Sequence, residues 1–167
     1  MSSQYASGTS VAPEKSRAEI ERTLARFGAT AFAYMTTPER AAIVFEFRQR
    51  RIRMALDLPQ ERDFKYTPTR QLRSPSAARA AHEQAIRQRW RALLLLVKAK
   101  LEAVTSGITT FESEFLSATL LPSGATVGEW MEPQLDDVYA SGRMPPLLPG
   151  VSAPAPLALP EATYREE

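Results

Sequence analysis

The sequence predicts a small α+β protein. The expected fold is a three-stranded antiparallel sheet with a short N-terminal helix and one long helix packed on it, then short C-terminal helices, in the order α-β-β-β-α-α-α. Apolar residues alternate with polar ones over residues 40–58, which is typical of half-buried antiparallel strands. They recur at steps of three and four over residues 86–104, which is typical of a helix packed by one face.

The first helix is expected to begin at residues 16–19, Ser-Arg-Ala-Glu, which have the spacing of a capping box. The apolar residues that follow share one helical face: Ile20, Leu24 and Phe27. Gly28 is expected to end this helix, because a left-handed residue is wanted there. Residues 1–13 are rich in small polar residues without an apolar period, so we expect a disordered lead-in.

Three strands are expected over residues 29–37, 40–48 and 51–58, the last two joined by the turn Arg48-Gln49-Arg50-Arg51. Residues 59–75 hold three prolines and no period, which predicts a connecting loop. The long helix is expected to begin at Ser74-Pro75 and to stop at Gly107. We expect one core, formed by Ile43, Phe45, Phe47, Ile52, Met54 and Leu56 of the strands and Trp90, Leu94, Val97 and Leu101 of the helix.

Two capping-box patterns, residues 109–112 and 126–129, predict short helices over 110–118 and 127–141. Pro133 predicts a later start or a bend in the second helix. Trp130 lies on an apolar period, as Trp90 does, and both are expected in the core. Residues 14–143 are thus expected to form a single domain, and 144–167 a proline-rich tail in which Leu147-Leu148 is a candidate for docking.

Charge is sorted along the chain. Residues 1–104 carry 19 Lys/Arg and 10 Asp/Glu, whereas residues 105–167 carry 2 and 9. Within the expected domain, residues 14–104 form a basic part and 105–143 an acidic part. Such asymmetry indicates either a polyanionic partner or contact of one half with the other.

The basic part contains two candidate nucleic-acid-binding groups. The first is the expected hairpin and the loop after it, and its members are Arg48, Arg50, Arg51, Arg53, Lys65, Arg70 and Arg73. Arginine forks match phosphate oxygens, but arginines also protect exposed sheet edges, and a protein contact is a third interpretation. The second group, on one face of the long helix, is Arg87, Arg91 and Lys98, which a merely solvated face would also explain. If these groups bind nucleic acid, the acidic segment 105–143 is expected to lie away from them.

Catalytic and metal sites are not expected. The chain has no cysteine, its single histidine, His82, is expected at the surface, and Asp136-Asp137 is expected on a solvated acidic face. The glycine-rich phosphate-binding patterns and the nucleophile elbow are absent from the sequence. We therefore expect no enzyme and no cofactor. The N-terminus lacks the pattern of a signal peptide, and the apolar run Ala92–Val97 is too short to span a membrane, so we expect a cytoplasmic protein without membrane contact.

Two stretches carry a resemblance. Residues 89–93 (Arg-Trp-Arg-Ala-Leu), 98–104 and 107–112, together with 124–130 and 139–145, are similar to proteins encoded by phages and prophages. Those proteins have no established activity, so the resemblance implies a viral setting, with the host cytoplasm as location, and no catalytic residues.

Two function classes follow from the sequence. The first is a non-enzymatic accessory protein that binds nucleic acid, of unknown type, through the basic hairpin and helix face. The second is a protein-binding module that engages or inhibits a host protein complex. A homo-oligomer in which the basic front of one copy meets the acidic back of another is a variant of the second class.

Overall fold

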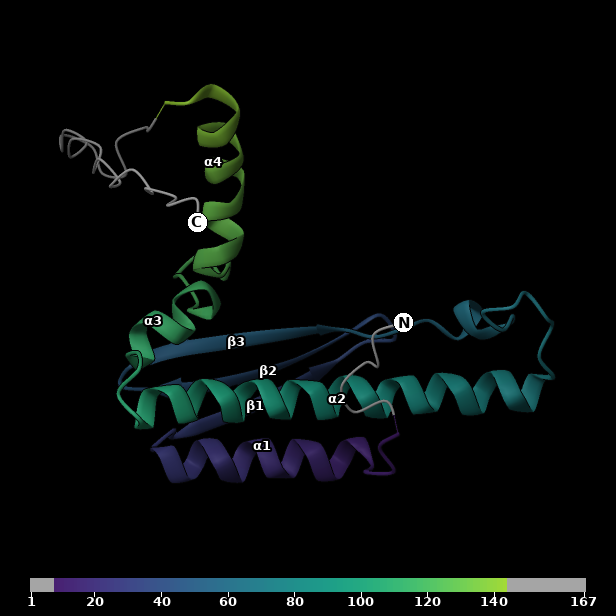
Figure 1. Ribbon diagram of the computed structural model, residues 1–167. Coiled ribbons are helices and arrows are strands. Elements are labelled where there is room, and N and C mark those ends of the chain that lie inside the picture. Colours follow the sequence, from purple (N-terminus) through teal and green to yellow (C-terminus); the bar gives the residue numbers. More distant parts are fainter. Residues whose placement is uncertain (1–7, 144–167) are drawn as a thin grey trace, which may run out of the picture. The chain divides into compact units, whose positions relative to one another are not determined.

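The computed structural model describes residues 8–143 and confirms the α+β fold in the predicted order (Figure 1). The chain divides into two units, residues 1–129 and 130–167. The elements are α1 (Pro13–Phe27), β1 (Ala31–Thr36), β2 (Arg40–Phe47), β3 (Arg50–Asp57), the 3₁₀ turn η1 (Glu61–Phe64), α2 (Pro75–Thr105), α3 (Phe111–Phe115), the 3₁₀ turn η2 (Leu116–Ala118) and α4 (Val127–Ser141).

The sheet has the order β1-β2-β3, with both pairs antiparallel. The turn between β2 and β3 has two residues, Arg48 and Gln49, and not the four expected. Both have positive φ, 48° and 64°, as a type I′ turn requires, and the turn pairs Phe47 with Arg50. The turn contains no glycine, so both residues adopt a left-handed backbone conformation that L-residues rarely adopt.

The two edges of the sheet differ. β3 is partly covered, because Thr119 forms a bridge with Ile52 and Leu120 N donates to Arg51 O at 2.7 Å. On its outer side, β1 pairs with no strand among residues 8–143. Its six residues, Ala-Phe-Ala-Tyr-Met-Thr, include no charge and no proline.

The predicted core is confirmed. α1 and α2 lie side by side on one face of the sheet (Figure 1), where the apolar face of each strand meets them. All the strand and helix residues expected in the core are buried except Leu56, which is half-buried and packs against the others. Trp90 is only 3% exposed, as expected, but Trp130 is 49% exposed, so its placement in the core was wrong.

α1 begins at Pro13, three residues before the expected capping box. Proline at the first helical position needs no partner for its nitrogen, and Ala12 precedes it without a side-chain cap. Ser16 is therefore inside the helix, where it is fully buried, and its Oγ has no hydrogen-bond partner among residues 8–143. Residues 1–7 of the expected lead-in, and the tail 144–167, lie outside the described residues.

The other helix caps follow the sequence more closely. Ser74 Oγ accepts a hydrogen bond from Ala77 N at the start of α2. Thr110, one residue later than expected, caps α3. The capping box of α4 is confirmed, because Thr126 N donates to Glu129 Oε2 at 2.8 Å and Glu129 N donates to Thr126 Oγ1 at 3.1 Å. α4 then continues through Pro133.

Candidate interaction surfaces

The predicted cations of the hairpin divide into engaged and free side chains. Arg53 is engaged, since it donates to Gly124 O at 3.1 Å and to Glu129 Oε2 at 2.5 Å, and its side chain is 23% exposed. Arg48 lies 3.7 Å from Glu112 and packs over the ring of Phe47. The other two, Arg50 and Arg51, are exposed, and neither has an acidic partner among residues 8–143.

Two of the three predicted helix-face cations lie at the contact between α1 and α2. Arg91 Nη1 is 3.2 Å from Glu19 Oε2, and Lys98 Nζ donates to the other oxygen of the same carboxylate. The hydrogen bond from Lys98, followed by the positive charges of Lys98 and Arg91, lowers the pKa of Glu19 below its ordinary value. Arg87 donates twice to Gln84 Oε1, at 3.0 and 2.7 Å. Arg91 and Lys98 thus join α1 to α2, and Arg87 is bonded within α2, so none of the three is part of a proposed nucleic-acid surface.

The loop cations form a third group. Arg73 donates to the carbonyls of Phe64 and Tyr66, at 3.0 and 2.5 Å, and so holds the loop closed from inside. Lys65 and Arg70 are exposed and have no acidic partner within the described part of the chain. The exposed ring of Tyr66 lies between these two cations in the chain. This loop follows the end of β3 opposite to the hairpin turn, and eight strand residues at ~3.3 Å each separate the two groups.

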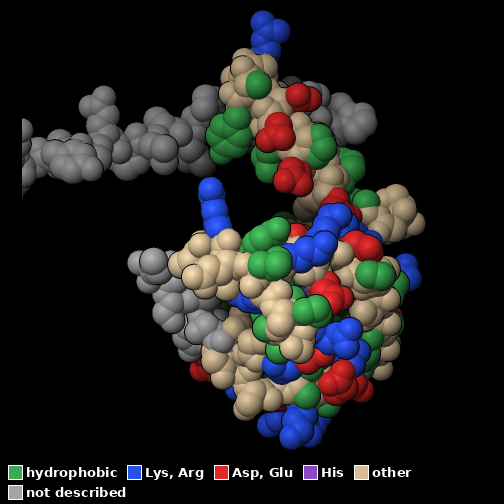
Figure 2. Space-filling model, turned by 90° about the vertical axis from the view of Figure 1, so that its right-hand side faces the viewer, with side chains coloured by type: hydrophobic (Ala, Val, Ile, Leu, Met, Phe, Trp, Pro, Cys, Tyr) green, Lys and Arg blue, Asp and Glu red, His purple; other side chains and the backbone are tan. Residues whose placement is uncertain are grey.

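The acidic segment does not lie away from the basic surface, contrary to the expectation. Three ion pairs join them within one chain, Arg48–Glu112, Lys100–Glu114 and Arg53–Glu129, at 3.7, 3.0 and 2.5 Å. Figure 2 shows Lys/Arg and Asp/Glu side chains interspersed on the face in view. Three of the six acidic residues of segment 105–143 therefore pair with cations of the basic part.

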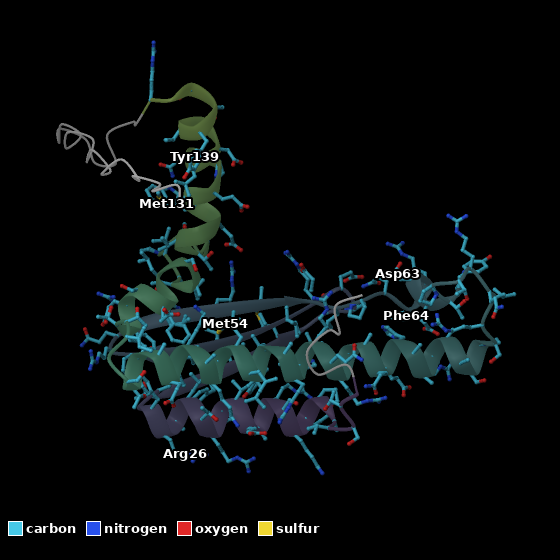
Figure 3. All side chains as sticks on the ribbon, in the orientation of Figure 1. Arg26, Met54, Asp63, Phe64, Met131 and Tyr139 are labelled. Carbon is cyan, nitrogen blue, oxygen red and sulfur yellow. The ribbon has the colours of Figure 1, made fainter. Side chains whose placement is uncertain are left out.

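Sequence reasoning missed a row of cations on the outer face of α1. Lys15, Arg22 and Arg26 are seven and four residues apart, which places them on one face, opposite Ile20 and Leu24. All three cations are exposed, and none has an acidic partner within residues 8–143. Figure 3 shows Arg26 projecting from α1 away from the sheet. The sequence indicates this row, because the three cations recur at helical spacing on the face opposite the apolar residues.

The helix α4 is amphipathic, and none of its 15 residues is buried. Its apolar residues recur at helical spacing, and Trp130, Leu135 and Tyr139 are 49%, 46% and 88% exposed. Met131 and Tyr139 both project from it in Figure 3. Its remaining surface carries only acidic charges, those of Glu129, Glu132, Asp136 and Asp137. The predicted apolar period is thus present in α4, whereas the burial that was expected of Trp130 is not.

His82 is half-buried and not simply a surface residue. Its Nε2 lies 2.8 Å from Pro59 O, and its ring centroid is 5.7 Å from that of Phe64, which points toward α2 in Figure 3. The ring thereby fixes η1 against α2. Among the described residues, no group of three or more His, Asp or Glu side chains is placed to hold a metal ion.

None of the helices within residues 8–143 combines the length and the apolar character that crossing a membrane requires. In comparisons with known proteins, no family model, no curated protein and no solved structure matches this chain. The resemblance to phage proteins therefore stays a prediction.

Proposed function

We propose that the protein is a non-enzymatic protein-binding module that uses α4 to dock into an apolar groove of a partner protein. The observation that carries this proposal is the complete apolar face of α4, none of whose residues is buried. A helix that is apolar along one face in water normally buries that face. Contiguous exposed apolar surface marks an interaction site.

The apolar face of α4 is formed by Met131, Leu135 and Val138, at i, i+4 and i+7, and the large exposed rings of Trp130 and Tyr139 lie at its two margins. This spacing suits recognition of an amphipathic helix in a groove. Tryptophan and tyrosine contribute large contact areas, and they are enriched among residues whose truncation costs the most affinity.

The acidic side of α4 specifies the chemistry of the partner. Residues 127–141 hold four acidic and no basic side chains. We therefore propose a partner groove that is apolar at its floor and bordered by Lys or Arg. Complementary charge of this kind raises the association rate more than the affinity, so association is expected to slow as salt is added. The resemblance to phage proteins implies a host protein complex as the target, and we propose that this complex provides the groove.

The test compares matched variants of the whole chain on one purified partner. Proteins captured from a host lysate by the wild-type chain are identified, purified and titrated against three forms: wild type, Trp130→Ala/Leu135→Ala, and Leu116→Ala. Leu116 is 54% exposed but lies in η2, so it controls for loss of any exposed apolar side chain. We expect at least about a tenfold loss of affinity for the double variant, equivalent to ~1.4 kcal/mol, and none for the control. Equal affinity of all three forms would contradict the proposal.

Nucleic-acid binding is the second candidate, and it is supported by the exposed cations without an acidic partner in the described part of the chain, Arg50, Arg51, Lys65 and Arg70. Its test is a salt-resolved titration against single- and double-stranded DNA and RNA. We expect affinity to fall by about 0.7–0.9 log units per log unit of salt for each phosphate contact. The variant Arg50→Gln/Arg51→Gln should flatten the slope, whereas Arg91→Gln should leave it unchanged. Absence of binding at low salt would remove this candidate.

A further inference from the structure

Residues 65–73, which connect η1 to α2, form a small closed hairpin that we call the 65–73 loop. Its two arms meet at an antiparallel bridge between Tyr66 and Leu72. A backbone hydrogen bond of 2.8 Å lies on each side of this bridge, and the guanidinium of Arg73 donates to the carbonyl of Tyr66 from within. In Figure 1 the loop lies beyond the ends of the strands, next to the start of α2. The backbone of this loop is therefore fixed before any partner arrives.

Tyr66 and Leu72 form an exposed apolar pair on one face of the 65–73 loop. Opposite residues of an antiparallel bridge point to the same face, and their side chains lie closest when the flanking residues carry the hydrogen bonds, as they do here. Tyr66 is 58% exposed and Leu72 is 73% exposed. The loop thus presents an aromatic ring with a leucine beside it, open to a partner.

Arg70 occupies the left-handed position of the turn in this loop. Its backbone N–H donates to Thr67 O at 2.9 Å across a turn with Pro68 at the second position, and Arg70 itself has a φ of 61°. Glycine or asparagine normally takes this position, because a residue with a larger side chain is strained there. Arg70 is nevertheless exposed, and it has no acidic partner within residues 8–143. Backbone strain that no contact of the described chain offsets is a feature of ligand-binding loops.

The loop and the first turns of α2 carry only positive charge. Residues 64–82 contain four basic side chains and no acidic one, and the acidic residue just before them, Asp63, caps η1. Lys65 alternates with Tyr66 along its arm and so belongs to the opposite face, from which it adds to the positive potential. This potential favours an anionic partner. Two apolar side chains are too few for a stable protein interface, whereas a single aromatic ring is enough to stack one base.

We infer that the 65–73 loop binds single-stranded nucleic acid, with one base stacked on Tyr66 beside Leu72 and the adjacent phosphate held by Arg70. A duplex stacks its bases on one another and offers no free base face along its length, so the loop prefers single strands. Stacking discriminates little between the bases, so the loop tolerates different sequences. This inference rests on the second candidate function and assigns it to one loop, and it is independent of docking by α4.

The experiment titrates the whole chain against labelled short oligo-dT and oligo-U, and against a DNA duplex of the same length, by fluorescence anisotropy at several salt concentrations. Four forms are compared: wild type, Arg70→Gly, Tyr66→Ala and Tyr66→Phe. Arg89→Gln serves as the matched control, because Arg89 is exposed, forms no ion pair within the described residues and lies about 21 Å along α2 from Pro75. Thermal unfolding checks that every variant folds.

We expect wild type and the Arg89→Gln control to bind single strands alike, and more tightly than the duplex. Arg70→Gly should melt no lower than wild type, because glycine adopts a φ of 61° without strain, yet its salt dependence should fall by about 0.7 log units per log unit of salt, the loss of one phosphate contact. Tyr66→Ala should weaken binding at least about fivefold. Tyr66→Phe should keep the wild-type affinity, because stacking uses the ring and not the hydroxyl.

Three results would overturn the inference. Absence of single-strand binding at low salt removes it together with the second candidate function. Binding that Arg70→Gly and Tyr66→Ala leave unchanged, but that Arg50→Gln/Arg51→Gln removes, overturns the inference alone, because the nucleic acid would then lie on the turn between β2 and β3. Equal affinity for duplex and single strands overturns it as well, since no base would be stacked on the loop. The proposed docking of α4 stands or falls separately.

Discussion

Arg53 on β3 donates a hydrogen bond to Glu129 at the start of α4, with 2.5 Å between Nη2 and Oε2, across 76 positions of the chain. The same carboxylate accepts from Thr126 N and thereby caps the helix. This backbone hydrogen bond, followed by the charge of Arg53, lowers the pKa of Glu129 below its ordinary value. One carboxylate therefore both caps the start of α4 and joins Glu129 to the sheet.

Arg53→Ala is expected to lower the free energy of unfolding by about 1 kcal/mol, because a partly exposed ion pair and a hydrogen bond to Gly124 O are lost together. Chemical denaturation measures the change. Arg51→Ala, on the same strand with no ion pair among the described residues, should stay within ~0.5 kcal/mol of wild type. A double-mutant cycle with Glu129→Gln isolates the pair, and a coupling of zero would show that it contributes nothing.

Leu94→Ala should cost ~2–5 kcal/mol of stability, because Leu94 is fully buried between α2 and the sheet and its truncation leaves a cavity. Ile108→Ala is the matched control, since Ile108 is 80% exposed. Its effect should stay within ~0.5 kcal/mol. Equal losses for the two variants, measured by urea denaturation, would mean that the core is placed incorrectly.

Stability should fall as pH is lowered through the acid range, and Glu19 should account for part of this fall. Its pKa is lowered in the folded state relative to its ordinary value of 4.5. Below that value the unfolded chain binds the proton more readily than the folded one, so protonation favours unfolding. Glu19→Gln should therefore be less stable than wild type at neutral pH, and the difference should shrink below about pH 4.5. A difference that is constant with pH would contradict this assignment.

Alkaline titration should show one late tyrosine. Burial, followed by the negative charge of Glu21, raises the pKa of Tyr34 to about 12. Its hydroxyl donates to Arg17 O at 3.2 Å. Because the folded state keeps this proton longer than the unfolded state, stability should decline as pH rises above 10, the ordinary pKa of tyrosine. Phenolate absorbance should lose its latest step in Tyr34→Phe, and an unchanged titration would be contrary to expectation.

Gln49→Gly should stabilise the protein by roughly 1 kcal/mol, because residue 49 has a φ of 64° and glycine adopts that conformation without steric cost. Gln49→Ala is the control, since alanine keeps the Cβ atom and should change stability little. Thermal unfolding of the pair measures the difference. A Gly variant no more stable than the Ala variant would show that the turn holds no strain.

Local signals in the sequence were sufficient for most of the fold. Ser74-Pro75 and Gly107 predicted the ends of α2 because caps act within one turn, and the alternation around Phe45 and Ile52 predicted β2 and β3. The predicted start of α1 was wrong because two local signals compete there. The helix begins at Pro13 and not at the capping-box pattern that starts at Ser16.

The candidate sites were harder to predict, because what covers a side chain depends on residues far along the chain. Glu19 lies 72 positions from Arg91, and no local pattern indicates their contact. For Trp130, the period correctly identified the apolar face of α4, but periodicity does not say whether another part of the chain covers that face. The α1 row of cations follows from the sequence, because Lys15, Arg22 and Arg26 recur at helical spacing on the face opposite Ile20 and Leu24.

The uncharged outer edge of β1 has a consequence for the behaviour of the protein at high concentration. Natural sheets protect such edges with lysine, proline or a bulge, because unpaired backbone groups recruit strands from other molecules. The strand Ala31–Thr36 contains no lysine and no proline, and its pairing with β2 is continuous, without a bulge. Slow growth of ordered aggregates should therefore start from this strand, and one lysine in place of Ala33, whose side chain is exposed, is the smallest change expected to suppress it.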